Sequence, residues 1–123
     1  MPFFSIIIPL YNKEKFIENT IKSVLGQSFE DFELIVVNDG STDTSLELVN
    51  KLKDKRIKTY SISNAGVSKA RNFGIQKATS KLIVFLDADD WWKNNHLQEL
   101  YKLRKAHPCL LYTSDAADDW SGV

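Results

Sequence analysis

The chain has 123 residues and a formal net charge of zero, from 16 basic and 16 acidic side chains. This is the length of one domain, and the charge balance does not favour a nucleic-acid partner. Apolar residues make up 43% of the sequence, while glycine and proline total only eight residues, which excludes disordered and collagen-like chains.

Short apolar runs rich in Ile, Val and Phe alternate along the chain with segments of helical period, which is typical of βαβ units around a parallel sheet. The runs predict strands at residues 4–9, 32–37, 56–62 and 81–86. Because the first two runs are apolar at consecutive positions, we expect helices on both faces of the sheet. Right-handed crossovers predict the strand order 3-2-1-4 and therefore an α/β, Rossmann-like fold.

Four helices are predicted between and after these strands. The first runs from Lys13 to Leu25, with Asn12 as its N-cap and Gly26 as its C-terminal stop. The second begins after Asp43, and the others cover residues 67–78 and 95–105. In the third helix, small residues that include Gly74 share a face narrow enough for close packing.

Polar residues follow the carboxyl ends of all four predicted strands. These polar segments are residues 9–12, 38–40, 64–66 and 87–90. Ligands of open α/β sheets bind beyond the carboxyl ends of the strands, where the strand order reverses, which here lies between strands 1 and 4. The four segments are therefore expected to converge on one crevice.

Asp87 and Asp89 stand two residues apart at an extended strand end, so their side chains should point the same way. Two carboxylates on one side form a hard-oxygen site for Mg²⁺ or Mn²⁺, and substrate phosphates often complete the shell of such an ion. A solvated acidic turn that caps the next helix is the alternative. An EF-hand loop is excluded because Trp92 occupies the position of its obligatory glycine.

Asp39 and Arg71 are further candidates near this crevice. Asp39 can accept hydrogen bonds from a ribose or a base, or it can cap the helix that follows it. The sequence contains no glycine-rich phosphate loop of the dinucleotide or P-loop type. A bound diphosphate would therefore need a metal ion and basic side chains, and Arg71, one helical turn from Gly66, is the natural candidate. By position alone it is equally well a surface arginine.

Four blocks of this sequence resemble those of the family 2 glycosyltransferases, inverting enzymes of the GT-A nucleotide-diphospho-sugar fold. The blocks are residues 5–12, 36–43, 64–74 and 85–90, in the family's order and spacing. The resemblance implies a hexosyl-type transferase that moves a sugar from a nucleotide-diphospho-sugar, typically a UDP-sugar, to an acceptor hydroxyl. It also implies a carbohydrate or lipid-linked acceptor and a role in cell-surface polysaccharide synthesis.

The resemblance assigns the nucleoside pocket to four residues. Pro9 and Tyr11 would line it, Asp39 would read the base, usually uracil, and Arg71 would lie beside the nucleotide.

The resemblance assigns the sugar and phosphate side of the site to the acidic segment. Asp87 would approach the ribose, and Asp89 would ligate the Mg²⁺ or Mn²⁺ ion that bridges the diphosphate. The general base that deprotonates the acceptor lies beyond Pro108 in the family pattern. No catalytic base is therefore expected in this chain.

Residues 109–123 differ in character from the rest of the chain. They are typical of neither a helix nor a strand, and they resemble the translation of a transposon-type sequencing adapter. We expect residues 1–108 to be the N-terminal nucleotide-sugar-binding part of a glycosyltransferase domain, and residues 109–123 to be an artefactual tail. A natural acidic tail is the alternative.

The longest apolar run, residues 82–86, is far shorter than the roughly 20 residues that span a bilayer, so no membrane span is expected in this segment. The N-terminus has no basic signal-peptide region, and the single Cys109 cannot form an internal disulfide. These features favour a cytoplasmic location, at the cytoplasmic face of the membrane in a longer protein.

Two other interpretations of the sequence remain open. A non-catalytic receiver-type α/β domain also gathers aspartates at its strand ends, but it should carry an acidic pair after its first strand, where this chain has residues 9–12. A truncated chain with an uncovered sheet edge would be inactive and prone to aggregate.

Overall fold

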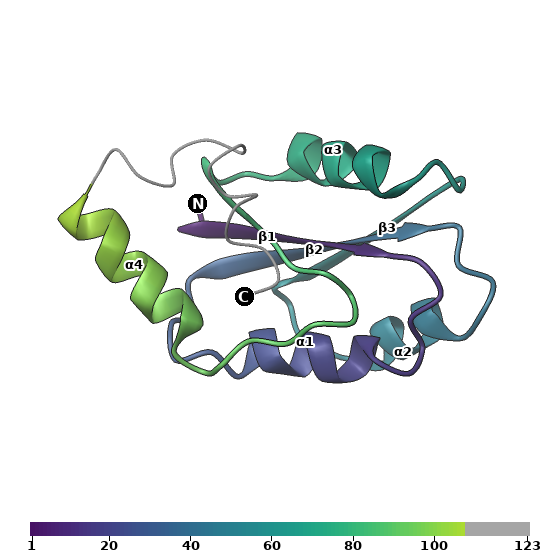
Figure 1. Ribbon diagram of the computed structural model, residues 1–123, viewed down its shortest axis with the longest axis horizontal. Coiled ribbons are helices and arrows are strands. Elements are labelled where there is room, and N and C mark those ends of the chain that lie inside the picture. Colours follow the sequence, from purple (N-terminus) through teal and green to yellow (C-terminus); the bar gives the residue numbers. More distant parts are fainter. Residues whose placement is uncertain (108–123) are drawn as a thin grey trace.

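The computed structural model describes residues 1–107, and the tail of residues 109–123 lies outside the described residues (Figure 1). Residues 1–107 form strands β1 (Phe4–Leu10), β2 (Phe32–Asp39), β3 (Ile57–Ile62) and β4 (Leu82–Phe85). They also form helices α1 (Ile17–Leu25), α2 (Ser45–Lys51), α3 (Val67–Lys77) and α4 (His96–Ala106). All strand pairs are parallel and their order is β3-β2-β1-β4, which confirms the predicted topology.

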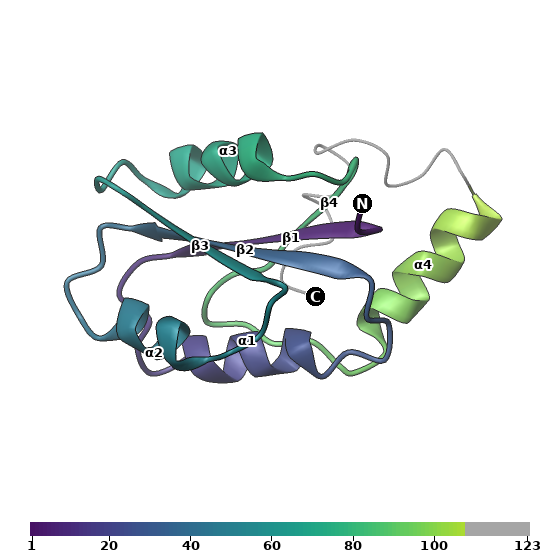
Figure 2. The same ribbon diagram turned by 180° about the vertical axis from the view of Figure 1, so that it is seen from behind.

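Helices cover both faces of the sheet, with α3 on one face and α1 and α2 on the other (Figure 1). Successive residues of β1 serve opposite layers: Ile6 and Ile8 belong to the core beneath α1 and α2, while Ile7 belongs to the core beneath α3. This two-sided burial explains why β1 and β2 are apolar at consecutive positions. Figure 2 shows α4 beside the start of β1, at the end of the sheet opposite to the carboxyl ends of the strands.

No helix within residues 1–107 is both long enough and apolar enough to cross a bilayer.

Helix α3 approaches β1 closely at Gly74, as the narrow face of small residues predicts. A Cβ atom placed on Gly74 would lie 2.6 Å from Cγ2 of Ile7, whose side chain is fully buried. A contact this short requires Ile7 or the helix to shift, and Ile7 lies in a closely packed core. Glycine at this position therefore sets the distance between α3 and the sheet.

Helix α1 begins four residues later than the sequence predicts, and Asn12 is not its N-cap. Residues 14–16 form a turn, across which the Ile17 N–H donates to the Lys13 carbonyl at 2.8 Å. Asn12 has a φ of 50°, in the left-handed region, and its side chain bonds residues 42 and 43 instead of the start of α1. The actual N-cap, Phe16, makes no side-chain cap bond. The cap prediction was wrong because the Asn12 side chain serves a distant loop.

A buried carboxylate joins several elements at the start of the strands. Glu33 of β2 is 3% exposed and accepts hydrogen bonds from the Ser5 hydroxyl at 2.5 Å and the Lys58 ammonium at 2.8 Å. It also accepts bonds from the N–H and the hydroxyl of Thr79, at 2.6 and 2.9 Å. Burial raises the pKa of Glu33, but these hydrogen bonds outweigh it and lower the pKa to about 2.

The Glu33 network predicts a loss of stability in acid. Because the pKa of Glu33 falls from 4.5 in the unfolded chain to about 2 in the folded chain, its stabilisation is complete above pH 4.5 and is lost toward pH 2. The free energy of unfolding from urea titrations should therefore be lower for Glu33→Gln than for the unchanged chain, by roughly 3 kcal/mol at pH 7. The difference should shrink steadily below pH 4.5; a pH-independent difference would contradict the role of ionised Glu33.

The close packing at Gly74 predicts that Gly74→Ala destabilises the chain, by about 1 to 3 kcal/mol for overpacking of this kind. The double variant Gly74→Ala with Ile7→Ala removes the atoms that the new methyl group meets. Urea unfolding should therefore show that Gly74→Ala costs less in the Ile7→Ala background than in the unchanged chain. Equal costs in the two backgrounds would show that Ile7 does not set the spacing.

Candidate functional site

A cavity of about 410 Å³ opens where the chain leaves the carboxyl ends of the strands. Its volume is in the range of small-molecule sites, and it lies where the sheet order reverses between β1 and β4. Its lining is Pro9, Leu10, Tyr11, Lys13, Asp39, Asn64, Gly66, Val67, Asp87, Ala88 and Asp89. The four polar segments that follow the strands therefore all contribute to one cavity.

Most of the residues singled out from the sequence lie on this cavity. Those that line it are Pro9, Tyr11, Asp39, Asp87 and Asp89. Arg71 of α3 does not line the cavity but lies beside it, with a guanidinium nitrogen 3.6 Å from Oδ1 of Asp87. The Arg71 guanidinium also lies over the ring of Phe85, 5.3 Å from its centroid. Arg71 is thus held at the rim by a charge and by an aromatic face.

Three carboxylates lie close together directly after β4. Oxygen atoms of Asp87, Asp89 and Asp90 all lie within 4.8 Å of one another, and the Asp90 N–H donates to the Asp87 carbonyl at 3.0 Å, which closes the turn. Burial and the charges of its two neighbours raise the pKa of Asp90. A set of hard oxygen donors that repel one another fits Mg²⁺ or Mn²⁺.

Asp39 holds together two segments of the cavity wall. It is 4% exposed, and its two carboxylate oxygens accept the N–H groups of Ala65 at 2.8 Å and Gly66 at 3.0 Å. Gly66, at the start of α3, has a φ of 99°, which favours glycine. The helix-cap alternative for Asp39 is not what the structure shows. Asp39 bonds the chain before α3, and the N-cap of α2 is Thr44, which makes no side-chain cap bond.

Lys13 is a residue of the cavity that sequence analysis does not single out. Its ammonium nitrogen lies 3.5 Å from Oδ2 of Asp89. The sequence assigns Lys13 to the start of a helix, whereas the structure places it in the loop between β1 and α1. The one available signal is its position two residues after Tyr11, within the polar segment that follows β1. Lys13 and Arg71 each bring a positive charge to a different carboxylate.

The loop after β1 is fastened to the loop after β2. Oδ1 of Asn12 accepts the N–H groups of Thr42 at 2.8 Å and Asp43 at 3.3 Å. Oε1 of Glu14 accepts the N–H of Thr44 at 3.0 Å and its hydroxyl at 2.7 Å. We call these bonds the Asn12–Glu14 clasp. Because Tyr11 and Lys13 flank Asn12, the clasp fixes the wall of the cavity on that side.

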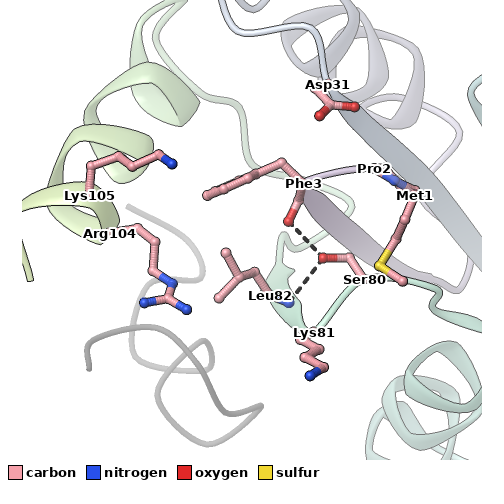
Figure 3. A pocket seen from close by; sticks show the side chains of 9 residues that line it. All are labelled: Met1, Pro2, Phe3, Asp31, Ser80, Lys81, Leu82, Arg104 and Lys105. Atoms are coloured by element: carbon pink, nitrogen blue, oxygen red, sulfur yellow. Dashed lines mark hydrogen bonds between the residues drawn. The ribbon is translucent and has the colours of Figure 1, made fainter. Parts of the chain in front are cut away.

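A second cavity, of about 450 Å³, lies at the opposite end of the sheet (Figure 3). Its one hydroxyl, that of Ser80, already donates to the Phe3 carbonyl at 2.6 Å and accepts the Leu82 N–H at 3.0 Å. Its basic side chains come from Lys81 and from the last turn of α4. These groups do not converge as the carboxylates after β4 do, so the first cavity is the stronger candidate for a site.

Comparison with known proteins points to one family. Residues 5–119 match the family model described as glycosyl transferase family 2. The minor teichoic acid biosynthesis protein GgaA of Bacillus subtilis is 44% identical over 106 residues, which cover 80% of this chain and 24% of that protein. The chain spans less than half the length of the curated relatives it matches.

Two solved structures share the fold. S. aureus TarS 1–349 in complex with UDP-GlcNAc is 33% identical, with a TM-score of 0.82 over 86% of this chain and 32% of that chain. Mannosyltransferase PcManGT from Pyrobaculum calidifontis, in complex with GDP-Man and Mn²⁺, is 26% identical, with a TM-score of 0.81 over 89% of this chain and 34% of that chain. These neighbours confirm the GT-A type of α/β fold that the sequence predicts.

The clasp predicts that Asn12→Ala destabilises the chain through two separable effects. The variant loses the hydrogen bonds to residues 42 and 43, and it places an alanine at a φ of 50°. Asn12→Gly loses the same bonds without the backbone strain. In urea unfolding, Asn12→Ala should cost about 1 kcal/mol more than Asn12→Gly, and Asn12→Gly should still be less stable than the unchanged chain. Equal stability of all three would show that the clasp contributes nothing.

Proposed function

Because the chain belongs to glycosyl transferase family 2, we propose that residues 1–108 bind the nucleotide-diphospho-sugar donor of a glycosyltransferase in the cavity beside β1 and β4. The observation that carries the proposal is the group of three carboxylates within 4.8 Å at the rim of a cavity of suitable size. The complexes of TarS with UDP-GlcNAc and of PcManGT with GDP-Man and Mn²⁺ support it.

The nucleoside would lie between the loop after β1 and the end of β2. Tyr11 is 44% exposed and lines the cavity with Pro9, so its ring is available for a base to stack on. Each oxygen of Asp39 accepts one backbone N–H and retains a further lone pair. Asp39 can therefore still accept a hydrogen bond from a base, and the N3–H donor of uracil fits such an acceptor. We propose a UDP-sugar as the donor.

The diphosphate would lie beside the acidic segment. We propose that Asp89 ligates a divalent cation, Mg²⁺ or Mn²⁺, while Asp87 approaches the ribose, and the hard oxygen donors of the cluster fit such an ion. When bound, the ion would neutralise charge on the diphosphate of the departing nucleotide. Lys13 and Arg71, which pair with Asp89 and Asp87, would add positive charge to the same region.

Transfer requires more than donor binding. We propose that the reaction proceeds with inversion, and that the general base for the acceptor hydroxyl lies in the part of a longer protein that follows residue 108. In this proposal the present chain binds the donor without transferring its sugar. We propose a carbohydrate or lipid-linked acceptor and a location at the cytoplasmic face of the membrane. The name of the relative GgaA, a minor teichoic acid biosynthesis protein, supports a role in cell-surface polysaccharide synthesis.

Calorimetry of the 123-residue chain with UDP tests this function. Binding should require Mn²⁺ or Mg²⁺, and Asp89→Asn should weaken it at least tenfold because the ion loses a ligand. Glu99→Gln is the matched control, since it removes the same charge from an exposed position on α4 and should bind as the unchanged chain does. The proposal fails if the folded chain binds no UDP, or if Asp89→Asn and Glu99→Gln bind equally well.

A further inference from the structure

We call Asp87, Asp89 and Asp90 the acidic cluster. Helix α1 and the residues directly after it hold the main chain that carries this cluster. Thr20 is 1% exposed, and its hydroxyl lies 2.8 Å from the Ala88 carbonyl and 2.6 Å from the Asp90 carbonyl. One hydroxyl proton serves both acceptors, so the two carbonyls share it. Thr20 therefore contacts the main chain on both sides of Asp89.

Two further side chains extend this row of contacts. The Ser23 hydroxyl accepts the Trp92 N–H at 3.1 Å and donates to the Thr20 carbonyl at 2.7 Å. The amide of Gln27, which is 3% exposed, donates to the Lys93 carbonyl and accepts the Leu97 N–H at 2.9 Å. With spacings of three and four residues, these positions share one side of α1 and its continuation. We call Thr20, Ser23 and Gln27 the α1 row.

The hydrogen bonds from the α1 row to the segment after β4 all join main-chain groups of residues 88–97. Near this turn, the side chains of Leu86, Ala88 and Trp92 are buried. Asp87 and Asp89 instead line the cavity, and Asp89 is exposed. The α1 row thus fixes the backbone and leaves the carboxylate oxygens available to a ligand.

The acidic cluster needs such support because its members repel one another. The repulsion between two like charges a few ångströms apart near a protein surface exceeds what one internal hydrogen bond contributes. Lys13 and Arg71, each beside a carboxylate of the cluster, offset part of this repulsion. Several hydrogen bonds from α1 and from Gln27 hold the main chain of the turn against the remaining repulsion.

We propose that Thr20, Ser23 and Gln27 are positioning residues, which hold the turn of Asp87, Asp89 and Asp90 in the geometry that accepts a metal-bound nucleotide. This inference rests on the proposed function, because the turn that α1 holds in place belongs to the proposed donor site. The sequence gives a partial signal: Thr20 is a hydroxyl residue within the apolar stripe of Ile17, Ile21 and Val24.

The test compares Thr20→Val, which keeps the shape of the side chain and removes the hydroxyl, with Thr20→Ser, which keeps the hydroxyl. Calorimetry with UDP and Mn²⁺ should show affinity about tenfold weaker in Thr20→Val, and Thr20→Ser should restore most of it. Ser23→Ala, at a half-buried position, should show a smaller loss and gives a result even if Thr20→Val does not fold.

The control separates positioning from stability. Ser5→Ala also removes a buried hydroxyl, but from the Glu33 network at the other end of the sheet. It should lower the free energy of unfolding and leave UDP affinity unchanged. If Thr20→Val folds and binds UDP with Mn²⁺ as tightly as Ser5→Ala does, the α1 row does not position the cluster.

A second measurement keeps this inference distinct from the proposed function. Amide hydrogen exchange of Trp92 should be at least tenfold faster in Thr20→Val and Ser23→Ala than in Ser5→Ala, because the turn after β4 opens locally. If the unchanged chain binds no UDP, the proposed function fails, and the exchange of Trp92 then decides whether α1 orders the turn. Unchanged exchange in both α1 variants would overturn the inference.

Discussion

Repulsion among the carboxylates of the turn after β4 is the constraint on which the rest of the site depends. Three acidic side chains within 4.8 Å do not stabilise a fold by themselves, so the surrounding structure must compensate. Arg71 of α3 lies beside Asp87, and Lys13 from the loop after β1 lies beside Asp89. Arg71 comes from α3, and Lys13 from the loop that leads to α1. Because α3 and α1 cover opposite faces of the sheet (Figure 1), the geometry of the site depends on the packing of both helical layers.

The fold was largely predictable because its signals are local and repeated. Apolar residues at consecutive positions mark β1 and β2 as strands covered on both faces, and the strand bounds agree with the sequence prediction to within two residues. The order β3-β2-β1-β4 then follows from the handedness of parallel crossovers. The same topology brings the ends of the strands together, so a cavity lined by Asp39, Asp87 and Asp89 was predictable without any knowledge of side-chain contacts.

The predictions that failed, or that sequence analysis could not make, concern polar side chains with distant partners. Asn12 precedes an apolar helical period and has the chemistry of an N-cap, yet it bonds a loop 30 residues away. Thr20 stands 68 residues from the carbonyl of Ala88 that it contacts. A local pattern specifies which residues are polar, but partner choice depends on which loops the sheet brings side by side. The sequence did not predict Lys13 as a residue of the cavity for the same reason, since its partner Asp89 lies at the end of another strand.

Glu33 and Asp90, at opposite ends of the sheet, differ in the direction of their pKa shifts. At the start of the strands, buried Glu33 receives bonds from Ser5, Lys58 and Thr79, and its pKa falls to about 2. At the carboxyl ends, burial and neighbouring charges raise the pKa of Asp90. Buried Glu33, which several protein donors bond, stabilises the fold, whereas a carboxylate crowded by other carboxylates gains from a cation. The crowding of Asp87, Asp89 and Asp90 is therefore what marks the carboxyl ends of the strands as the candidate site.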